Sequence, residues 1–187
     1  MGQVEKEEKS NEITAIPRLL ELLEIKKCIM IIDAIGCQKS ITAHIIKKKA
    51  DYILGVKSNQ PTLHTDFVEY FEKYLSRQNV LSAKFGMFET EDKAHGRLEV
   101  RRCWRSTELN GLPVAKQLLG ARSVLKVECE RNTNTGKSFE VRYFISLLPL
   151  NPEKVLSAVR QHWFVENQLH WVLGVTFGED GRAAPPR

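Results

Sequence analysis

The stretch from residue 28 to residue 56, CIMIIDAIGCQKSITAHIIKKKADYILGV, decides the fold. It holds two apolar runs, at 28–33 and 51–56, and between them isoleucines recur with helical spacing over 38–49. Short continuous apolar runs predict strands that are buried on both faces, and Cys28 within the first run then behaves as a small buried hydrophobe. Two strands joined by a helix predict a right-handed crossover and a parallel pair.

Helical patterns flank this stretch on both sides. We expect a helix at 16–24, capped by Thr14, with Pro17 in its first turn, where a missing N–H costs little. We expect another helix at 61–76, which Pro61 opens. The order helix, strand, helix, strand, helix predicts the α/β class with a largely parallel sheet.

The pattern changes after residue 83. Alternation of apolar and polar residues predicts four strands, at 84–92, 96–105, 122–131 and 138–147. A closing helix is expected at 152–173. Turns are expected at 110–111 and 132–136, where Asn and Gly cluster.

Composition narrows the class of protein. A chain of 187 residues with 42% hydrophobic and 27% charged residues can bury one core. No apolar run approaches the roughly 20 residues that a membrane-spanning helix needs, and no secretory signal is visible, so we expect a cytoplasmic protein without a membrane partner. The four cysteines form no C-x-x-C pair, which disfavours a structural zinc site.

The net charge of +5 is concentrated in one stretch. Residues 93–137 hold ten basic and four acidic groups. Such an excess suits contact with a polyanion such as DNA, and an ordinary solvated face is an equally good interpretation of charge alone.

Polar residues follow both predicted strands of the opening stretch. Asp33 ends the first strand, where a metal ligand and a turn or helix cap are both reasonable roles. Lys57, Asn59 and Gln60 follow the second strand and could hold a phosphate or a base edge, although a polar loop before a proline is the simpler interpretation.

Two further segments could carry function. In HGRLEVRR (95–102), alternation places Arg97, Glu99 and Arg101 on one face of a strand, which suits either phosphate contact or protection of an edge strand by charge. In RQHWFVENQLHW (160–171), His162 and Glu166 share one face of a helix and could bind a divalent metal ion. A helix that buries its tryptophans in the core and turns its polar groups outward explains the pattern equally well.

Four motifs together resemble a known family. IDAIGCQKSI (32–41), DYILGVKSNQPTLH (51–64), HGRLEVRR (95–102) and HWFVENQLHWVLGVTFGED (162–180) are similar to the H-repeat-associated branch of bacterial insertion-sequence transposases. These belong to the DDE transposases, which have a ribonuclease-H-like core. The likeness runs in order from about residue 3 to residue 180.

The resemblance implies a site and a reaction. Asp33 corresponds to the family's second catalytic Asp, and Glu166 to its catalytic Glu on a helix after a β-rich insertion. The implied cofactor is Mg²⁺, or Mn²⁺, because paired metal ions would assist in-line attack on a phosphate. If Asp33 and Glu166 hold the same pair of ions, their carboxylates should lie within about 10 Å of each other. The implied partner is DNA, at element ends and target, with no small-molecule substrate. Candidate DNA-binding residues are Lys57, Asn59, Gln60, His95, Arg97, Arg101, Arg102, His162 and Asn167.

The departures from the family pattern shape the remaining expectations. No D-G-K motif for the first catalytic Asp precedes Asp33, and the usual L-D-V after the Glu helix is Leu173-Gly174-Val175. We therefore expect a polar tail at 1–12, a partial ribonuclease-H-like domain at 13–180 that lacks its first two core strands and carries the β-rich insertion at about 84–147, and an unstructured terminus at 181–187.

Such a chain would be a truncated and inactive transposase remnant, associated with the nucleoid when bound to DNA. An unpaired sheet edge would favour aggregation or a homo-oligomer. The alternatives are a non-catalytic DNA-binding remnant, a pseudogene product without function, and a ribonuclease-H-like nuclease that acts in a complex.

Overall fold

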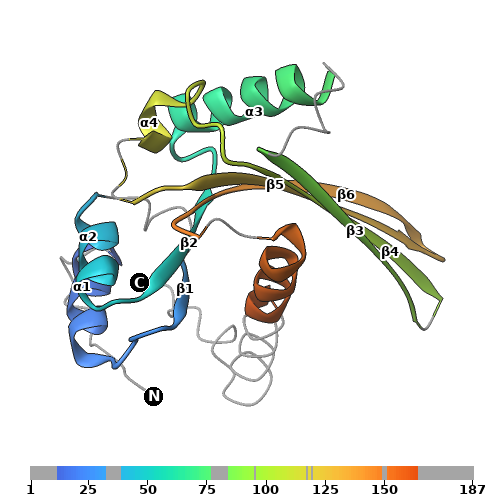
Figure 1. Ribbon diagram of the computed structural model, residues 1–187. Helices are drawn as coiled ribbons and strands as arrows, with labels where there is room; N and C mark the ends of the chain where they lie inside the picture. Colours follow the sequence, from blue (N-terminus) through green and yellow to red (C-terminus); the bar gives the residue numbers. More distant parts are fainter. Residues whose placement is uncertain are drawn as a thin grey trace, which may run out of the picture.

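The computed structural model describes residues 12–32, 39–76, 84–94, 96–116, 118, 120–148 and 151–163. Figure 1 shows a curved sheet with helices packed on both of its faces. In chain order the elements are α1 (Glu12–Leu22), β1 (Ile29–Ile32), α2 (Lys39–Lys47), β2 (Asp51–Val56), α3 (Pro61–Ser76), β3 (Phe85–Ala94), β4 (Arg97–Ser106), α4 (Pro113–Lys116), β5 (Ser123–Thr133) and β6 (Gly136–Ser146). A further helix occupies residues 152–163.

The six strands form one mixed sheet in the order β1-β2-β6-β5-β4-β3. This confirms the α/β class, but the expectation of a largely parallel sheet is wrong. Strands β1 and β2 are parallel, whereas β6 pairs antiparallel with β2 and the hairpin strands β3 to β6 are antiparallel throughout. The β-rich segment therefore extends the same sheet, because β6 returns alongside β2.

Most predicted elements are confirmed. Strand β2 and helix α3 have the predicted bounds, 51–56 and 61–76. The strands β3, β4, β5 and β6 all begin and end within two residues of their predicted positions. The turn at 134–135 closes β5 onto β6, where the Thr133 hydroxyl donates to the Gly136 carbonyl at 3.0 Å.

Three local expectations are wrong. Strand β1 is not buried on both faces, since Ile29 is 44% exposed and the other three residues are half-buried. Cys28 beside it is exposed rather than buried. Both follow from position, because within the described residues β1 pairs with β2 alone and forms the edge of the sheet. Helix α1 begins at Glu12, so Pro17 lies inside it and not in its first turn.

Helices α1 to α4 cover one face of the sheet, which we call the outer face. Their buried side chains, Phe67 and Phe71 of α3 among them, pack against Trp104, Tyr143 and Ile145 of the strands. No helix within the described ranges is long and apolar enough to cross a membrane.

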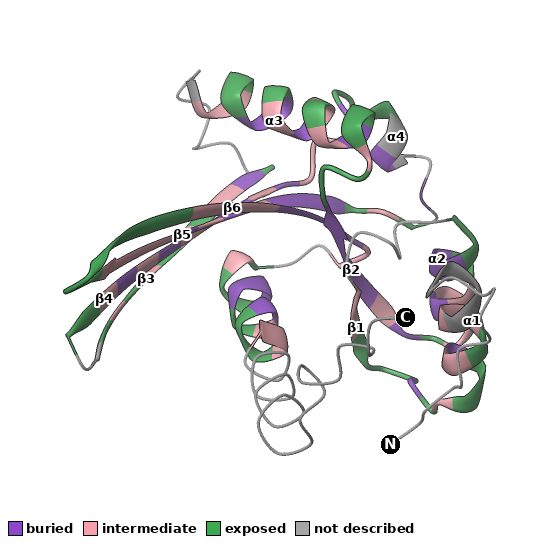
Figure 2. Ribbon diagram, turned by 180° about the vertical axis from the view of Figure 1, so that it is seen from behind, coloured by how far each residue is buried: buried purple, intermediate pink, exposed green. Residues whose placement is uncertain are grey.

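The 152–163 helix covers the opposite, inner face. Val155, Leu156 and Val159 are buried against the strands, and the helix lies on the concave side of the curved hairpin strands (Figures 1 and 2). The strand residues beneath it are Ile53, Cys103, Leu125, Val127 and Phe144. This packing fixes the helix that leads toward residue 166 against the centre of the sheet.

Candidate active site at the carboxyl ends of β1 and β2

A cavity of about 340 Å³ opens where β1 and β2 end. Ile31 and Ile32 of β1, and Val56, Lys57 and Ser58 at the end of β2, form one wall. The cavity exists because β2 pairs with β6 only as far as Val56 opposite Tyr143, while β6 continues beyond that point. Ligands in open α/β sheets bind in crevices of this kind, outside the carboxyl ends of the strands.

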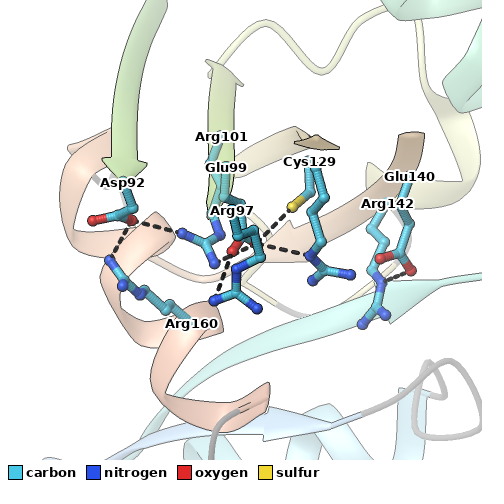
Figure 3. Close-up of polar contacts among 9 residues, drawn as sticks. Asp92, Arg97, Glu99, Arg101, Cys129, Glu140, Arg142 and Arg160 are labelled. Atoms are coloured by element: carbon cyan, nitrogen blue, oxygen red, sulfur yellow. Dashed lines mark hydrogen bonds and ion pairs between the residues drawn. The ribbon is translucent and has the colours of Figure 1, made fainter. Parts of the chain in front are cut away.

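Strand β6 and the 152–163 helix supply the opposite wall. Glu140 and Arg142 of β6 face His162 and Trp163 of the helix. The Arg142 guanidinium lies 4.1 Å from the centroid of the Trp163 ring, and its Nε is 2.5 Å from the Glu140 carboxylate, a contact that Figure 3 includes. Trp163 of the helix is thus held at the cavity by a cation–π contact, and the Glu140 carboxylate orients the arginine.

The cavity combines cationic, aromatic and imidazole groups. Lys57 and Arg142 bring positive charge, and His64 of α3 lies edge-on to Tyr143 with ring centroids 5.5 Å apart. Glu140 is a carboxylate in the wall. Such a lining suits an anionic ligand with a flat ring, and within the described ranges no group of three His, Cys, Asp or Glu side chains could hold a metal ion.

Several predicted site residues lie outside the described residues, namely Asp33, His95, Glu166 and Asn167. The predicted separation of Asp33 and Glu166 therefore stays a prediction. Their chain neighbours are informative, because Ile32 directly precedes Asp33 and Trp163 lies three residues before Glu166. Both neighbours line the same cavity, although 131 positions separate them in the sequence.

The other candidates near the cavity have clear positions. Lys57 and His162 line it, whereas Asn59 is exposed and Gln60 half-buried in the turn that follows. The Gln60 backbone amide donates to the Lys57 carbonyl at 3.0 Å, which closes that turn.

The arginines of β4 divide between the two faces. Arg97, Glu99 and Arg101 share the inner face as predicted, and Glu99 meets Arg97 at 3.4 Å and Arg101 at 2.5 Å. Arg102 lies on the outer face, where its Nε donates to Glu89 at 2.6 Å and its Nη1 is 3.8 Å from Glu130. Strand β4 is not an edge, since it pairs with both β3 and β5.

The inner-face charges form one network, which Figure 3 shows. Asp92 of β3 meets Arg101 and Arg160, each at 2.9 Å. Glu99, which is 2% exposed, also accepts from the Arg131 Nε at 2.9 Å and from the Cys129 thiol at 3.0 Å. The network joins β3, β4 and β5 to the helix through Arg160.

Burial alone would raise the pKa of Glu99. The hydrogen bonds from Cys129 and Arg131, with the positive charges of Arg101 and Arg131, outweigh it and hold that pKa below its ordinary value. Burial and the neighbouring carboxylate raise the pKa of Cys129 to about 11, so it remains a neutral thiol donor.

Sequence reasoning missed Arg131 and Arg160. The antiparallel pairing of β4 with β5 places Arg131 opposite Glu99, and because helix α4 lies in the connection between these strands, their register is not set by a tight turn. Arg160 meets Asp92 across 68 positions of sequence, and no local pattern signals that contact.

Comparison with known proteins covers nearly the whole chain. Residues 2–182 match the family described as Transposase DDE domain. The Escherichia coli O157:H7 protein named "Putative transposase YncI" is 41% identical over 191 residues, covering 96% of this chain and 46% of that protein. The K12 protein "H repeat-associated putative transposase YhhI" is 40% identical over 190 residues, covering 96% and 48%. The chain thus spans about half the length of these relatives, and no solved structure matches it.

Proposed function

Because the chain belongs to the family of DDE transposase domains, we propose that it carries part of a metal-dependent site for cutting and joining DNA strands. The site is the cavity at the carboxyl ends of β1 and β2. One observation carries this proposal: Ile32 and Trp163, which lead into Asp33 and Glu166, line that single cavity. The partner is DNA, and the chain acts in the cytoplasm where that DNA lies.

A ribonuclease-H-like core is the finer fold that we propose. A mixed sheet with helices on both faces, in which a parallel pair continues into antiparallel hairpins, supports it. The 152–163 helix follows the β-rich segment, which is the place in the chain that the resemblance gives to the helix of the catalytic Glu, and it packs on the inner face of the sheet.

The donor chemistry fits a divalent cation. The carboxylates of Asp33 and Glu166 are hard oxygen ligands of the kind that Mg²⁺ and Mn²⁺ prefer. The residues that lead into them in the sequence, Ile32 and Trp163, line the cavity, and its wall holds another carboxylate, that of Glu140. When bound, paired cations of this type lower the cost of the charge that develops on a phosphate during in-line attack.

The chain's own residues bind and orient the DNA strand. Lys57 and Arg142 place cations in the cavity wall, where they attract a phosphodiester. Arg142 also keeps the 152–163 helix in place through the Trp163 ring. The amides of Asn59 and Gln60, just outside the cavity, are suited to base edges or phosphate oxygens.

Binding of Mn²⁺ tests the proposal without requiring turnover. The purified chain and the variants Asp33→Asn, Glu166→Gln and Glu153→Gln are titrated with Mn²⁺ and followed by electron paramagnetic resonance. We expect either site variant to weaken binding at least about tenfold, because each removes a charged oxygen ligand. Glu153, exposed at the start of the same helix, is the matched control and should leave binding unchanged. Equal binding by all four proteins would contradict the proposal.

A further inference from the structure

The inner face carries a cluster of charges beside the 152–163 helix. We call it the arginine cluster, and its members come from β3, β4, β5 and the helix: Asp92, Arg97, Glu99, Arg101, Arg131 and Arg160. Its acids are fully engaged, since Asp92 meets two guanidinium groups and Glu99 meets three.

The cluster keeps an excess of positive charge. Within it, two carboxylates meet four guanidinium groups, which leaves a net charge of +2. Cys129 adds no charge, because its raised pKa keeps it as a thiol. An excess of this kind in a partly desolvated place is stabilised by an external anion.

The cluster has a buried part and a part that is accessible to solvent. The Glu99 and Arg101 side chains are 2% and 7% exposed and form the floor. Arg97, Arg131 and Arg160 are 54%, 38% and 52% exposed and stand around that floor. Since the acids fix the arginines in place, less side-chain entropy is lost when a ligand binds than for free surface arginines.

The position relative to the cavity indicates which anion fits. Arg131 pairs with Ser138 of β6, and Cys129 pairs with Glu140, which lines the cavity. The cluster is therefore two residues along the strands from the cavity wall, or about 7 Å. A nucleic acid strand that enters the cavity would pass this cluster, and planar guanidinium groups match the oxygens of its phosphates.

We infer that Arg97, Arg131 and Arg160 form a binding site for the DNA backbone beside the cavity. This inference rests on the proposed function, because it takes DNA as the ligand. It assigns a role to Arg131 and Arg160 that their sequence positions did not suggest. It also withdraws Arg101 and Arg102 from DNA contact, since the first is buried between two acids and the second lies on the outer face.

The test compares the two faces of the sheet. Binding of a short duplex of mixed sequence is measured by fluorescence anisotropy at several salt concentrations, for the parent chain, for Arg97→Ala/Arg160→Ala and for Arg102→Ala. We expect the double variant to bind about tenfold more weakly and to lower the slope of log K against log salt by about 2, because each phosphate contact releases counterions. Arg102→Ala should keep the parent slope.

A second variant separates loss of contact from loss of fold. Arg97→Lys/Arg160→Lys retains both charges, so its salt slope should match that of the parent, and circular dichroism checks the fold of every protein. A double alanine variant that binds like the parent would overturn the inference, as would a parent chain that binds no DNA. The proposed function stands or falls separately, on Mn²⁺ binding at Asp33 and Glu166.

Discussion

The inner face of the sheet has two halves that follow the same strand alternation and differ in chemistry. Beneath the 152–163 helix its positions are apolar, including Cys103, Leu125 and Val127. Beside the helix they are ionic, including Glu99 and Arg131. Strand β4 passes through both halves, from the ionic half at Arg97 to the apolar half at Cys103. The part of the face that the helix covers is therefore apolar and the part beside it is ionic, although both follow the same strand alternation.

The two halves contribute differently to stability and to function. Burial of an apolar side chain stabilises by about 1.5–3 kcal/mol, whereas a buried ion pair must first offset the loss of solvation of both charges. The apolar half therefore holds the helix on the sheet. The ionic half orients the arginines and joins the helix to β3 through Arg160.

The largest effect is expected in the apolar half. Leu125 is fully buried beneath the helix, so Leu125→Ala should lower the free energy of unfolding by about 3–4 kcal/mol through lost burial and a residual cavity. Urea unfolding measures this. Leu22→Ala, the same change at a side chain that is 69% exposed, should alter stability by less than about 0.5 kcal/mol. Similar losses at both positions would refute the assignment of the core.

Removal of the central acid should have the next largest effect. Glu99→Gln removes the carboxylate that Arg101 and Arg131 share, and Arg101 keeps only Asp92, so we expect a loss of about 2–3 kcal/mol at pH 7. Since the pKa of Glu99 lies below its ordinary value of 4.5, its contribution is fully present above that pH and is lost as the pH falls through the folded-state pKa. The variant should therefore lose less stability than the parent over that acidic range.

The matched control for this charge lies on the outer face. Glu130→Gln removes a carboxylate that is 37% exposed and 3.8 Å from Arg102. We expect a change below about 1 kcal/mol, because exposed ion pairs contribute little. If both glutamine variants unfold with the parent's pH dependence, the inner-face network is not a buried one.

The smallest effect concerns the link between the two halves. A double-mutant cycle with Asp92→Asn and Arg160→Gln should give a coupling energy of about 0.5–1 kcal/mol, since Asp92 is 40% and Arg160 52% exposed. Urea unfolding of the four proteins measures it at low and high salt, and the coupling should shrink with salt. Strictly additive changes would show that this contact does not join the helix to β3.

Local sequence patterns predicted the elements well and their environment less well. Strand β2 and helix α3 were predictable because Pro61 marks the boundary between them and the periodicity changes there. The apolar run of β1 did not distinguish an edge strand from an interior one, since burial depends on neighbours that are distant in sequence. Exposed Ile29 and Cys28 are the result.

The charge count had a similar limit. The basic stretch 93–137 suggested a surface that is free to bind a polyanion. Acidic residues that precede this stretch, such as Glu89 and Asp92, neutralise part of its charge across the β3–β4 hairpin. Register decides which arginines remain available, and register places Arg102 opposite Glu89. The cavity likewise depends on where β2 stops pairing with β6, which no single segment shows.

Proximity of residues 33 and 166 is the central claim, and intramolecular cross-linking tests it most directly. The substitutions Asp33→Cys and Glu166→Cys are introduced together, with Cys28 and Cys37 changed to Ser. Cys103 and Cys129 can stay, because burial raises the pKa of these thiols to about 12 and about 11. A short bis-maleimide should join the two new thiols within one chain, since shared metals would require carboxylates within about 10 Å. If each new thiol instead carries its own single adduct, the account is contradicted. A control protein that combines Asp33→Cys with Lys154→Cys should give such separate adducts.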